Sequence, residues 1–322
     1  MSALPVSVIT GFLGSGKTTL LSRLLRDPAF ARTAVIVNEF GEVGLDHLLL
    51  EAGSEEIVLL EGGCLCCQAR GDLVRTAGEL LARRSRGEAD FERIVVETTG
   101  LADPAPILQA LMRDRELAGE LRLESVIATV DCTAGDATLD AHPESVKQAA
   151  LADRLVLTKA DLADPGALAE RLRRLNPSAP QLVAQHGEID ANLLFGFSVH
   201  EHWDLPLHAQ HFHSITETQT FCLRRSRPLH AVTLALFLQV LAEHCGARLL
   251  RLKGLVDVVE SPGRPAVIHG VQHVFHPPAF LDAWPDDDRG TRMVVISQGL
   301  ERAWMEDLLE ALEDEVKVCM IS

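Results

Sequence analysis

The nonapeptide GFLGSGKTT at residues 11–19 constrains the fold of this chain more than any other stretch. It follows the apolar run VSVIT and precedes the helix-like pattern LLSRLLRD, so the order is strand, glycine loop and helix. That order is the context that the phosphate-binding pattern G-x-x-x-x-G-K-[ST] requires. The alternative is a glycine turn that leads into a helix and binds nothing. The stretch therefore predicts a P-loop that cradles the phosphates of a nucleotide.

Each residue type in this loop has a physical role beside a triphosphate. Three glycines allow the backbone to curl so that its N–H groups face phosphate oxygens. These glycines are Gly11, Gly14 and Gly16. The helix that begins near Lys17 adds the positive end of its dipole. The Lys17 ammonium reaches the β- and γ-phosphates, the Thr18 hydroxyl ligates Mg²⁺, and Thr19 can hold the α-phosphate.

Further short apolar runs alternate with helical patterns along the first half of the chain. The runs are TAVIVN, EEIVLL, FERIVVE, LESVIATVD, DRLVLTK and PQLVA, and patterns such as DLVRTAGELLARR and GALAERLRRL lie between them. Such alternation predicts an α/β fold of the P-loop NTPase type, in which helices cover both faces of a mostly parallel sheet. Ligands of these folds bind at the carboxyl ends of the strands, where the remaining motifs also fall.

The motif VVETTG follows one of these strands and fits the magnesium side of a nucleotide site. Glu97 would hold Mg²⁺ through a water molecule, and the Gly100 N–H could approach the γ-phosphate and act as a switch. A carboxylate that merely caps the end of a strand is the alternative.

The motif LTKAD follows another strand and can recognise guanine. The stem of Lys159 would lie over the purine ring, and the Asp161 carboxylate would accept hydrogen bonds from N1–H and the exocyclic amine. Thr158 stands where the familiar N-K-x-D pattern has asparagine, so one amide is lost. The alternative is a solvated loop with a lysine and an aspartate.

The stretch EGGCLCC at residues 61–67 holds three of the seven cysteines of the chain. In an extended segment Cys64 and Cys66 point the same way and could grip one soft or borderline metal ion. Cys67, or a carboxylate from the switch-like stretch NEFGEVGLD at residues 38–46, could complete a tetrahedron. Zn²⁺ fits three thiolates best, and Co²⁺ and Ni²⁺ remain open. Buried small hydrophobic cysteines are the alternative. A redox pair is a third interpretation, although C-x-C-C is not C-x-x-C.

Composition narrows the classes of function. The 322 residues are 47% hydrophobic and carry a formal net charge of −16, which disfavours general binding to nucleic acid or to anionic membranes. No stretch is long and apolar enough to span a bilayer, and the N-terminus lacks the features of a secretory signal. The other cysteines are scattered and the total is odd, so we expect reduced thiols and a cytoplasmic location.

The alternation of strands and helices stops near Glu188, and the second half of the chain has a different pattern. Residues 186–217 are interpreted as an inter-domain linker that is either solvated or a low-affinity metal-loading site. Its clustered histidines are His200, His202, His208, His211 and His213. From residue 218 onward, strand-like stretches and two helical patterns predict a small α+β domain with an antiparallel sheet. Within it, His269 and His273 are expected to share a strand face and to pack there. The predicted domains are 1–187, 188–217 and 218–322.

The motifs GFLGSGKTT, NEFGEVGLD, EGGCLCC, ETTGLADPAP and TKADL, in this order, resemble the CobW-like GTPases. That metallochaperone family is related to the nickel-insertion GTPases of urease and hydrogenase. The stretches KGLVDV, HGVQHVF and RMVVISQGL resemble its C-terminal domain. The resemblance implies slow, metal-modulated GTP hydrolysis coupled to holding or delivering a transition metal.

The same resemblance implies particular site residues. GTP is expected at residues 14–19, which include Ser15, and at Lys159 and Asp161, with Thr158 a tolerated variant. The transition metal is expected on the Cys64, Cys66 and Cys67 segment and on a nearby glutamate, for which we choose Glu42.

The sequence therefore predicts a GTPase that couples hydrolysis to the transfer of a metal, most simply Zn²⁺, to a client protein. It would act as a monomer or a dimer. Glu39 and Asp46 are candidates for positioning the attacking water, because they lie on the switch-like loop. Three alternatives stay open: a metal sensor or buffer tuned by GTP, a small-molecule P-loop kinase, and ATP in place of GTP.

Overall fold

The computed structural model describes two compact units and leaves parts of the chain outside the description. The described residues are 3–38, 57–59, 67–114, 117, 119–186, 188–195, 212–213 and 218–321. The first unit comprises Met1–Arg171 and Ala179–Ser198. The second unit comprises Leu172–Ser178 and Val199–Ser322. The sequence-based boundaries at 187 and 217 remain a prediction. None of the helices in the described part is long and apolar enough to cross a membrane.

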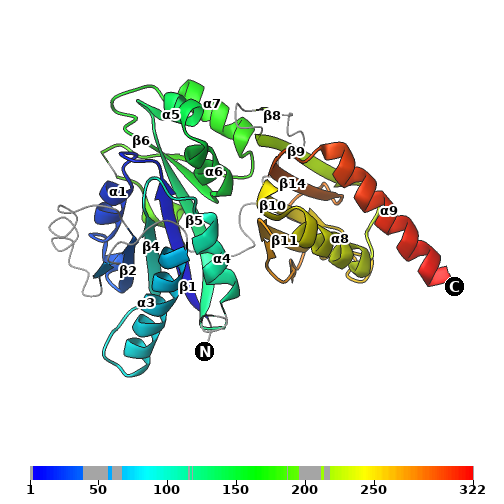
Figure 1. The fold of residues 1–322 in the computed structure, drawn as a ribbon, viewed down its shortest axis with the longest axis horizontal. Helices are drawn as coiled ribbons and strands as arrows, with labels where there is room; N and C mark the ends of the chain where they lie inside the picture. The colour runs from blue at the N-terminus through cyan, green and yellow to red at the C-terminus, as the bar shows by residue number, and fades with distance from the viewer. Residues whose placement is uncertain are drawn as a thin grey trace. The chain divides into compact units, whose positions relative to one another are not determined.

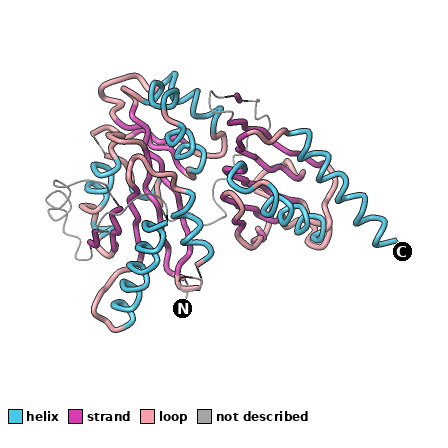
Figure 2. Tube along the Cα trace, in the orientation of Figure 1, coloured by secondary structure: helices cyan, strands magenta, loops and turns pink. Residues whose placement is uncertain are grey.

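The first unit is built on a seven-stranded sheet in which every pair of neighbours is parallel. Figures 1 and 2 show helices packed around its strands. The order across the sheet is β3-β2-β4-β1-β5-β6-β7. The strands are β1 (Leu4–Gly11), β2 (Thr33–Asn38), β3 (Ile57–Leu59), β4 (Arg93–Thr98), β5 (Leu121–Asp131), β6 (Arg154–Thr158) and β7 (Gln181–Val183). The predicted α/β fold with a parallel sheet is confirmed.

Helices cover this sheet on both faces, which explains why its strands are continuous apolar runs rather than alternating ones. The helices are α1 (Lys17–Leu24), α3 (Cys67–Ser85), α4 (Ala105–Arg113), α5 (Gly135–Ala141), α6 (Pro143–Leu151) and α7 (Gly166–Leu175). Ile9 of β1 packs in one cluster with Leu20 and Leu21 of α1. Val8, which is also fully buried, points to the opposite face because side chains alternate along a strand. Short 3₁₀ turns lie at Pro28–Phe30 and Ala191–Leu193.

The parallel arrangement brings the carboxyl ends of distant strands to one edge of the sheet. β1 ends at Gly11, β4 at Thr98, β5 at Asp131 and β6 at Thr158. The segments that follow these residues are therefore neighbours in space, at the edge where ligands of open α/β sheets bind.

The second unit is a small α+β domain, as predicted. Its antiparallel sheet has the order β12-β11-β10-β14-β9-β8, and β13 pairs with β11. The strands are β8 (Phe212–His213), β9 (Thr218–Arg225), β10 (Leu249–Val256), β11 (Ala266–Val271), β12 (Val274–Phe275), β13 (Ala279–Phe280) and β14 (Thr291–Gln298). The helices are α8 (Ala231–His244) and α9 (Arg302–Ile321), with a 3₁₀ turn at Gly246–Arg248. Phe221, Phe237 and Met305 belong to a single core cluster that joins both helices to the sheet.

One prediction about this domain was wrong. His269 lies on β11, but His273 lies in the turn before β12, so the two residues do not share a strand face. Gln272 has a φ of 53° and starts the reversal of the chain. The ring that lies beside His269 is instead that of His276, with 5.4 Å between the ring centroids.

Candidate functional site

The P-loop has the backbone that the sequence predicts. Gly11, Gly14 and Gly16 have φ values of 140°, 71° and 93°, in the region that favours glycine. A Cβ atom on Gly11 would lie 2.3 Å from Oγ1 of Thr129 and 2.5 Å from its carbonyl oxygen, so a larger residue does not fit there. A loop of this shape turns successive N–H groups toward a common point, where they can bind an anion.

Lys17 begins helix α1 and is only 5% exposed. Its ammonium donates hydrogen bonds to the carbonyl oxygens of Gly11 and Phe12, at 3.0 and 3.1 Å. The side chain therefore folds back across the loop and fixes its positive charge among the same residues that form the anion cradle. The α1 dipole adds positive potential at this end of the helix.

The structure brings together the two predicted magnesium residues, which lie 79 positions apart in the sequence. Thr18 Oγ1 donates to Glu97 Oε1 at 2.7 Å, and Glu97 is 1% exposed at the end of β4. A hydroxyl and a carboxylate oxygen side by side are hard ligands of the kind that Mg²⁺ prefers. These residues fit a magnesium ion that Thr18 ligates directly and Glu97 holds through a water molecule.

Gly100, the predicted switch residue, lies against the P-loop. A Cβ atom on Gly100 would come within 2.6 Å of the Leu13 backbone nitrogen, so only glycine permits this approach. The geometry supports a close contact between the segment that follows β4 and the phosphate end of the loop.

Thr158, which replaces the asparagine of the familiar guanine motif, has a specific contact. Its hydroxyl donates to the Ser15 carbonyl oxygen at 2.7 Å, and both residues are buried. The hydroxyl thus connects the predicted base-binding loop to the P-loop. The sequence shows that the amide is lost, but it does not predict the hydrogen bond from the Thr158 hydroxyl to the P-loop.

The next residues of the same loop have charged partners. Lys159 has a φ of 55°, and its ammonium donates to Asp131 Oδ2 at 2.5 Å. Burial raises the pKa of the Asp131 carboxyl, but hydrogen bonds from Lys159 and Thr133 outweigh it, so the net pKa is lowered. Asp161 lies 3.5 Å from the ring of His186. The loop therefore presents an oriented lysine and a carboxylate, as guanine recognition requires.

Sequence reasoning missed Asp131, although this residue ends a strand just as Glu97 does. It also missed a set of buried hydroxyl groups that joins the ends of adjacent strands. Ser15 Oγ and Thr129 Oγ1 are 2.6 Å apart, Thr129 Oγ1 donates to the Thr10 carbonyl at 3.3 Å, and Thr98 Oγ1 donates to Thr10 Oγ1 at 2.9 Å. Periodicity cannot reveal such contacts, because they arise only when the strands are side by side.

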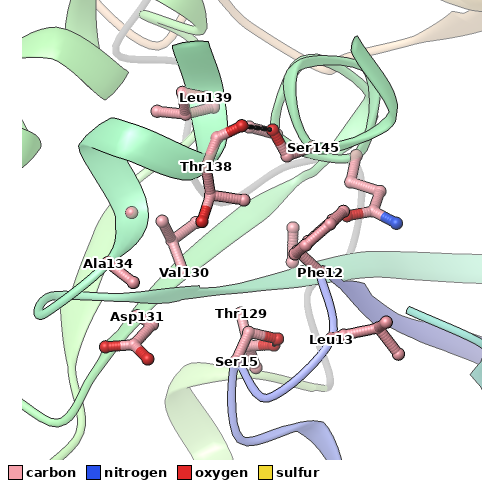
Figure 3. Close-up of a pocket in the computed structure, with 14 residues that line it drawn as sticks. Phe12, Leu13, Ser15, Thr129, Val130, Asp131, Ala134, Thr138, Leu139 and Ser145 are labelled. Carbon is pink, nitrogen blue, oxygen red and sulfur yellow. Dashed lines mark hydrogen bonds between the residues drawn. The ribbon is translucent and has the colours of Figure 1, made fainter. Parts of the chain in front are cut away.

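A small cavity lies between the P-loop, the end of β5 and helices α5 and α6 (Figure 3). Figure 3 shows Ser15 and Thr129 next to each other on one side and Thr138 with Ser145 on the other. The space available to water centres is about 30 Å³, which is room for about two water molecules. Phe12 lines it and stacks on His142, with 4.4 Å between ring centroids.

The predicted transition-metal residues are not placed by the structure. The predicted metal ligands Glu42, Cys64 and Cys66 lie outside the described residues. The predicted water-positioning residues, Glu39 and Asp46, also lie outside them. Cys67 is the first residue of α3, and only its backbone is described. Within the described part of the chain, no group of three histidine, cysteine or acidic residues could hold a metal ion.

Comparison with known proteins gives matches over nearly the whole chain. Residues 5–183 match the model of the CobW/HypB/UreG nucleotide-binding domain, and residues 218–313 match that of the cobalamin synthesis protein CobW C-terminal domain. The zinc chaperone YjiA of Escherichia coli is 34% identical over 305 residues, which cover 92% of this chain and 94% of YjiA. The zinc chaperone CobW of Pseudomonas aeruginosa is 33% identical over 345 residues, covering 94% and 90% of the two chains. The crystal structure of Zn(II)-bound YjiA GTPase superimposes with a TM-score of 0.73 at 28% identity, over 97% of this chain and 99% of YjiA.

Proposed function

This chain belongs to the CobW/HypB/UreG family, and from that membership and the geometry of its P-loop we propose that it is a GTP-hydrolysing metallochaperone. It couples the hydrolysis of GTP to GDP and phosphate to the binding and transfer of a transition metal, most simply zinc, to a client protein. The zinc chaperones and the zinc-bound GTPase among its relatives support this choice of metal.

One observation carries the proposal: the Thr18 hydroxyl and the buried Glu97 carboxylate meet at 2.7 Å beside the glycine loop. In the proposed complex Gly11 and residues 14–19 hold the phosphates, and Thr18 and Glu97 hold magnesium. Bound magnesium would offset negative charge on the β- and γ-phosphates.

The residues of the chain itself stabilise the transition state of hydrolysis. As water attacks the γ-phosphate, negative charge grows on its oxygens, and the Lys17 ammonium and the backbone N–H groups of the loop stabilise that charge. The Gly100 N–H is proposed to approach the same phosphate, which the close packing of Gly100 on the Leu13 backbone supports. Glu39 and Asp46 are the proposed residues for positioning the water.

Guanine is the proposed base because Lys159 and Asp161 follow the strand next to β5. Asp131 holds the Lys159 ammonium, which leaves the lysine stem to cover the purine ring. Thr158 holds the loop on the P-loop. The Asp161 carboxylate can accept two hydrogen bonds from guanine that adenine cannot offer.

The metal cargo is proposed to bind Cys64, Cys66, Cys67 and Glu42, with Co²⁺ and Ni²⁺ as further cargo that these ligands could take. Strand β3, which precedes the cysteine stretch in the sequence, ends at Leu59, at the same edge of the parallel sheet at which β1 ends before the P-loop. The proposal also includes the domains 1–187, 188–217 and 218–322, a monomer or dimer, and action in the cytoplasm, where thiols stay reduced.

The first experiment is competition binding of GTP against ATP, followed by phosphate release from GTP. We expect a preference for GTP of at least about tenfold, which corresponds to 1.4 kcal/mol. Equal affinity for the two nucleotides would refute the base assignment, and transfer of the phosphate to an acceptor other than water would indicate a kinase.

The second experiment measures zinc affinity with and without a GTP analogue and Mg²⁺, and then zinc transfer to an apo acceptor. A metallochaperone should bind zinc with a nucleotide-dependent affinity, and hydrolysis should change the rate of transfer. A transfer rate that hydrolysis does not alter would indicate a sensor or buffer instead.

A further inference from the structure

Gln148 occupies a position that the nucleotide site does not use directly. It lies in α6 and is 1% exposed. Its side-chain Nε2 donates to the carbonyl oxygens of Gly100 and Ala102, at 3.0 and 3.1 Å. Both partners can only accept, so the amide nitrogen must face the loop. Among the described residues, the buried Oε1 of Gln148 has no hydrogen-bond partner.

The neighbouring residue holds the same loop. Lys147 Nζ donates to Asp103 Oδ2 at 2.9 Å, and Asp103 also accepts from the Ala105 N–H at the start of α4. Two adjacent side chains of α6 therefore attach the segment 100–103 to one helix. These hydrogen bonds limit the movement of the segment 100–103 relative to α6.

The attached segment has little freedom toward the P-loop. Gly100 is buried, and the space for a Cβ atom on it is already filled by the backbone of Leu13. A shift of the Gly100 carbonyl would therefore either press the segment into the P-loop or pull it away. The hydrogen bonds from Gln148 select one position between these two.

We propose that Gln148 is a positioning residue for GTP hydrolysis: it fixes the Gly100 peptide at the distance from the P-loop at which the γ-phosphate is bound. This inference rests on the proposed function. Because GDP has no γ-phosphate, the effect of Gln148 is confined to the triphosphate and to the hydrolysis step. The Gln148 side chain also lines the small cavity beside the P-loop.

The test uses Gln148→Leu, which keeps the size of the side chain and removes the donor. The variant loses the two uncharged hydrogen bonds to the Gly100 and Ala102 carbonyl oxygens. We therefore expect about a tenfold lower kcat for GTP hydrolysis and about fivefold weaker binding of a non-hydrolysable GTP analogue. The affinity for GDP should stay within about twofold of wild type. Ser145→Ala is the matched control, since Ser145 lies on the same helix and lines the same cavity, whereas its hydroxyl donates to the carbonyl oxygens of Thr138 and His142. It should change none of these values.

A second variant covers the case in which Gln148→Leu does not fold. Lys147→Met removes the other attachment at a partly exposed position, and a selective loss of about twofold to fivefold for the GTP analogue is expected. An equal loss for GDP and the analogue, or a folded Gln148→Leu protein with wild-type kcat, would overturn the inference while leaving the proposed function intact. Wild-type protein that binds no guanine nucleotide would instead overturn the proposed function, and this inference with it.

Discussion

Thr158→Val removes one hydroxyl group from the interior of the nucleotide-binding unit and leaves the shape of the side chain almost unchanged. The Thr158 hydroxyl donates to the Ser15 carbonyl oxygen at 2.7 Å and lies 3.3 Å from the Val130 carbonyl oxygen. Valine cannot donate, so the Ser15 carbonyl loses that partner in a buried place. A net hydrogen bond is worth about 1 kcal/mol, and a buried acceptor left without a partner costs about 1–3 kcal/mol.

We therefore expect the free energy of unfolding of this unit to fall by about 2 kcal/mol. For a unit of this size that corresponds to a fall in Tm of about 4–8 °C. Because the same hydroxyl joins the base-binding loop to the P-loop, the affinity for GDP should also fall. A loss of about 1 kcal/mol in the complex corresponds to about fivefold weaker binding. Urea unfolding and isothermal titration with GDP and Mg²⁺ measure the two effects separately.

Two variants at the same position separate the hydroxyl from the packing. Thr158→Ser keeps the donor and loses a buried methyl, so it should cost about 1 kcal/mol of stability with GDP affinity unchanged. Thr158→Asn restores the amide of the N-K-x-D pattern and should bind GDP about as well as wild type. If Thr158→Val and Thr158→Ser weakened GDP binding equally, the connection between the two loops would not be the reason for the loss.

Three further changes test other parts of the site. Thr18→Val removes the hydroxyl group that is proposed to ligate Mg²⁺, so GTP hydrolysis measured as phosphate release should fall by about 100-fold or more, while GDP still binds in the absence of Mg²⁺. Cys66→Ser replaces a thiolate by a hydroxyl, so Zn²⁺ affinity from competition with a chelator should fall by orders of magnitude with GDP affinity unaltered; unchanged Zn²⁺ affinity would mean that the cysteines are structural. Lys159→Met should destabilise the protein more at about pH 7 than at about pH 3. Burial raises the pKa of Asp131, but Lys159 and Thr133 together lower it by more, so the stability is present above the ordinary value of 3.8 and is lost as the pH falls through the lower folded value. Urea midpoints of both proteins at the two pH values measure this difference, and a pH-independent difference would contradict it.

The fold was predictable because its signals are local and repeated. Continuous apolar runs such as LESVIATVD predict strands that are buried on both faces, and β5 is such a strand. The failure at His269 and His273 shows where this reasoning stops. A single strand through HGVQHVF would place His269 and His273 on one face, but the chain reverses at Gln272. That stretch contains none of the Asn-Gly or Pro signals that mark most tight turns.

The site was predictable where its residues belong to short recognisable motifs. The P-loop and the TKAD loop each carry their chemistry within a few neighbouring residues. Asp131, Thr129 and Gln148 have hydrogen-bond partners between 28 and 119 positions away, and no periodicity encodes such contacts. For Asp131 a weak signal existed, since an acidic residue at the end of a buried strand faces the ligand edge of the sheet. For Gln148 there was none, because a glutamine inside an amphipathic helix is usually solvated.

The order of the strands bears on whether a metal held by the cysteines could respond to the nucleotide. β3 is separated from β4 by β2 alone, so its end at Leu59 lies two strand spacings, about 10 Å, from the strand that ends with Glu97 and Thr98. Residues 60–66 connect Leu59 to the start of α3, and a chain of that length can extend over about 20 Å. That length exceeds the separation of the two strand ends, and Glu97, which is proposed to hold magnesium with Thr18, lies at one of them. Two divalent ions about 10 Å apart repel each other, because that separation is about one screening length at physiological ionic strength. Zinc on the cysteines and magnesium on the nucleotide should thus alter each other's affinity, and the coupling must be equal in both directions.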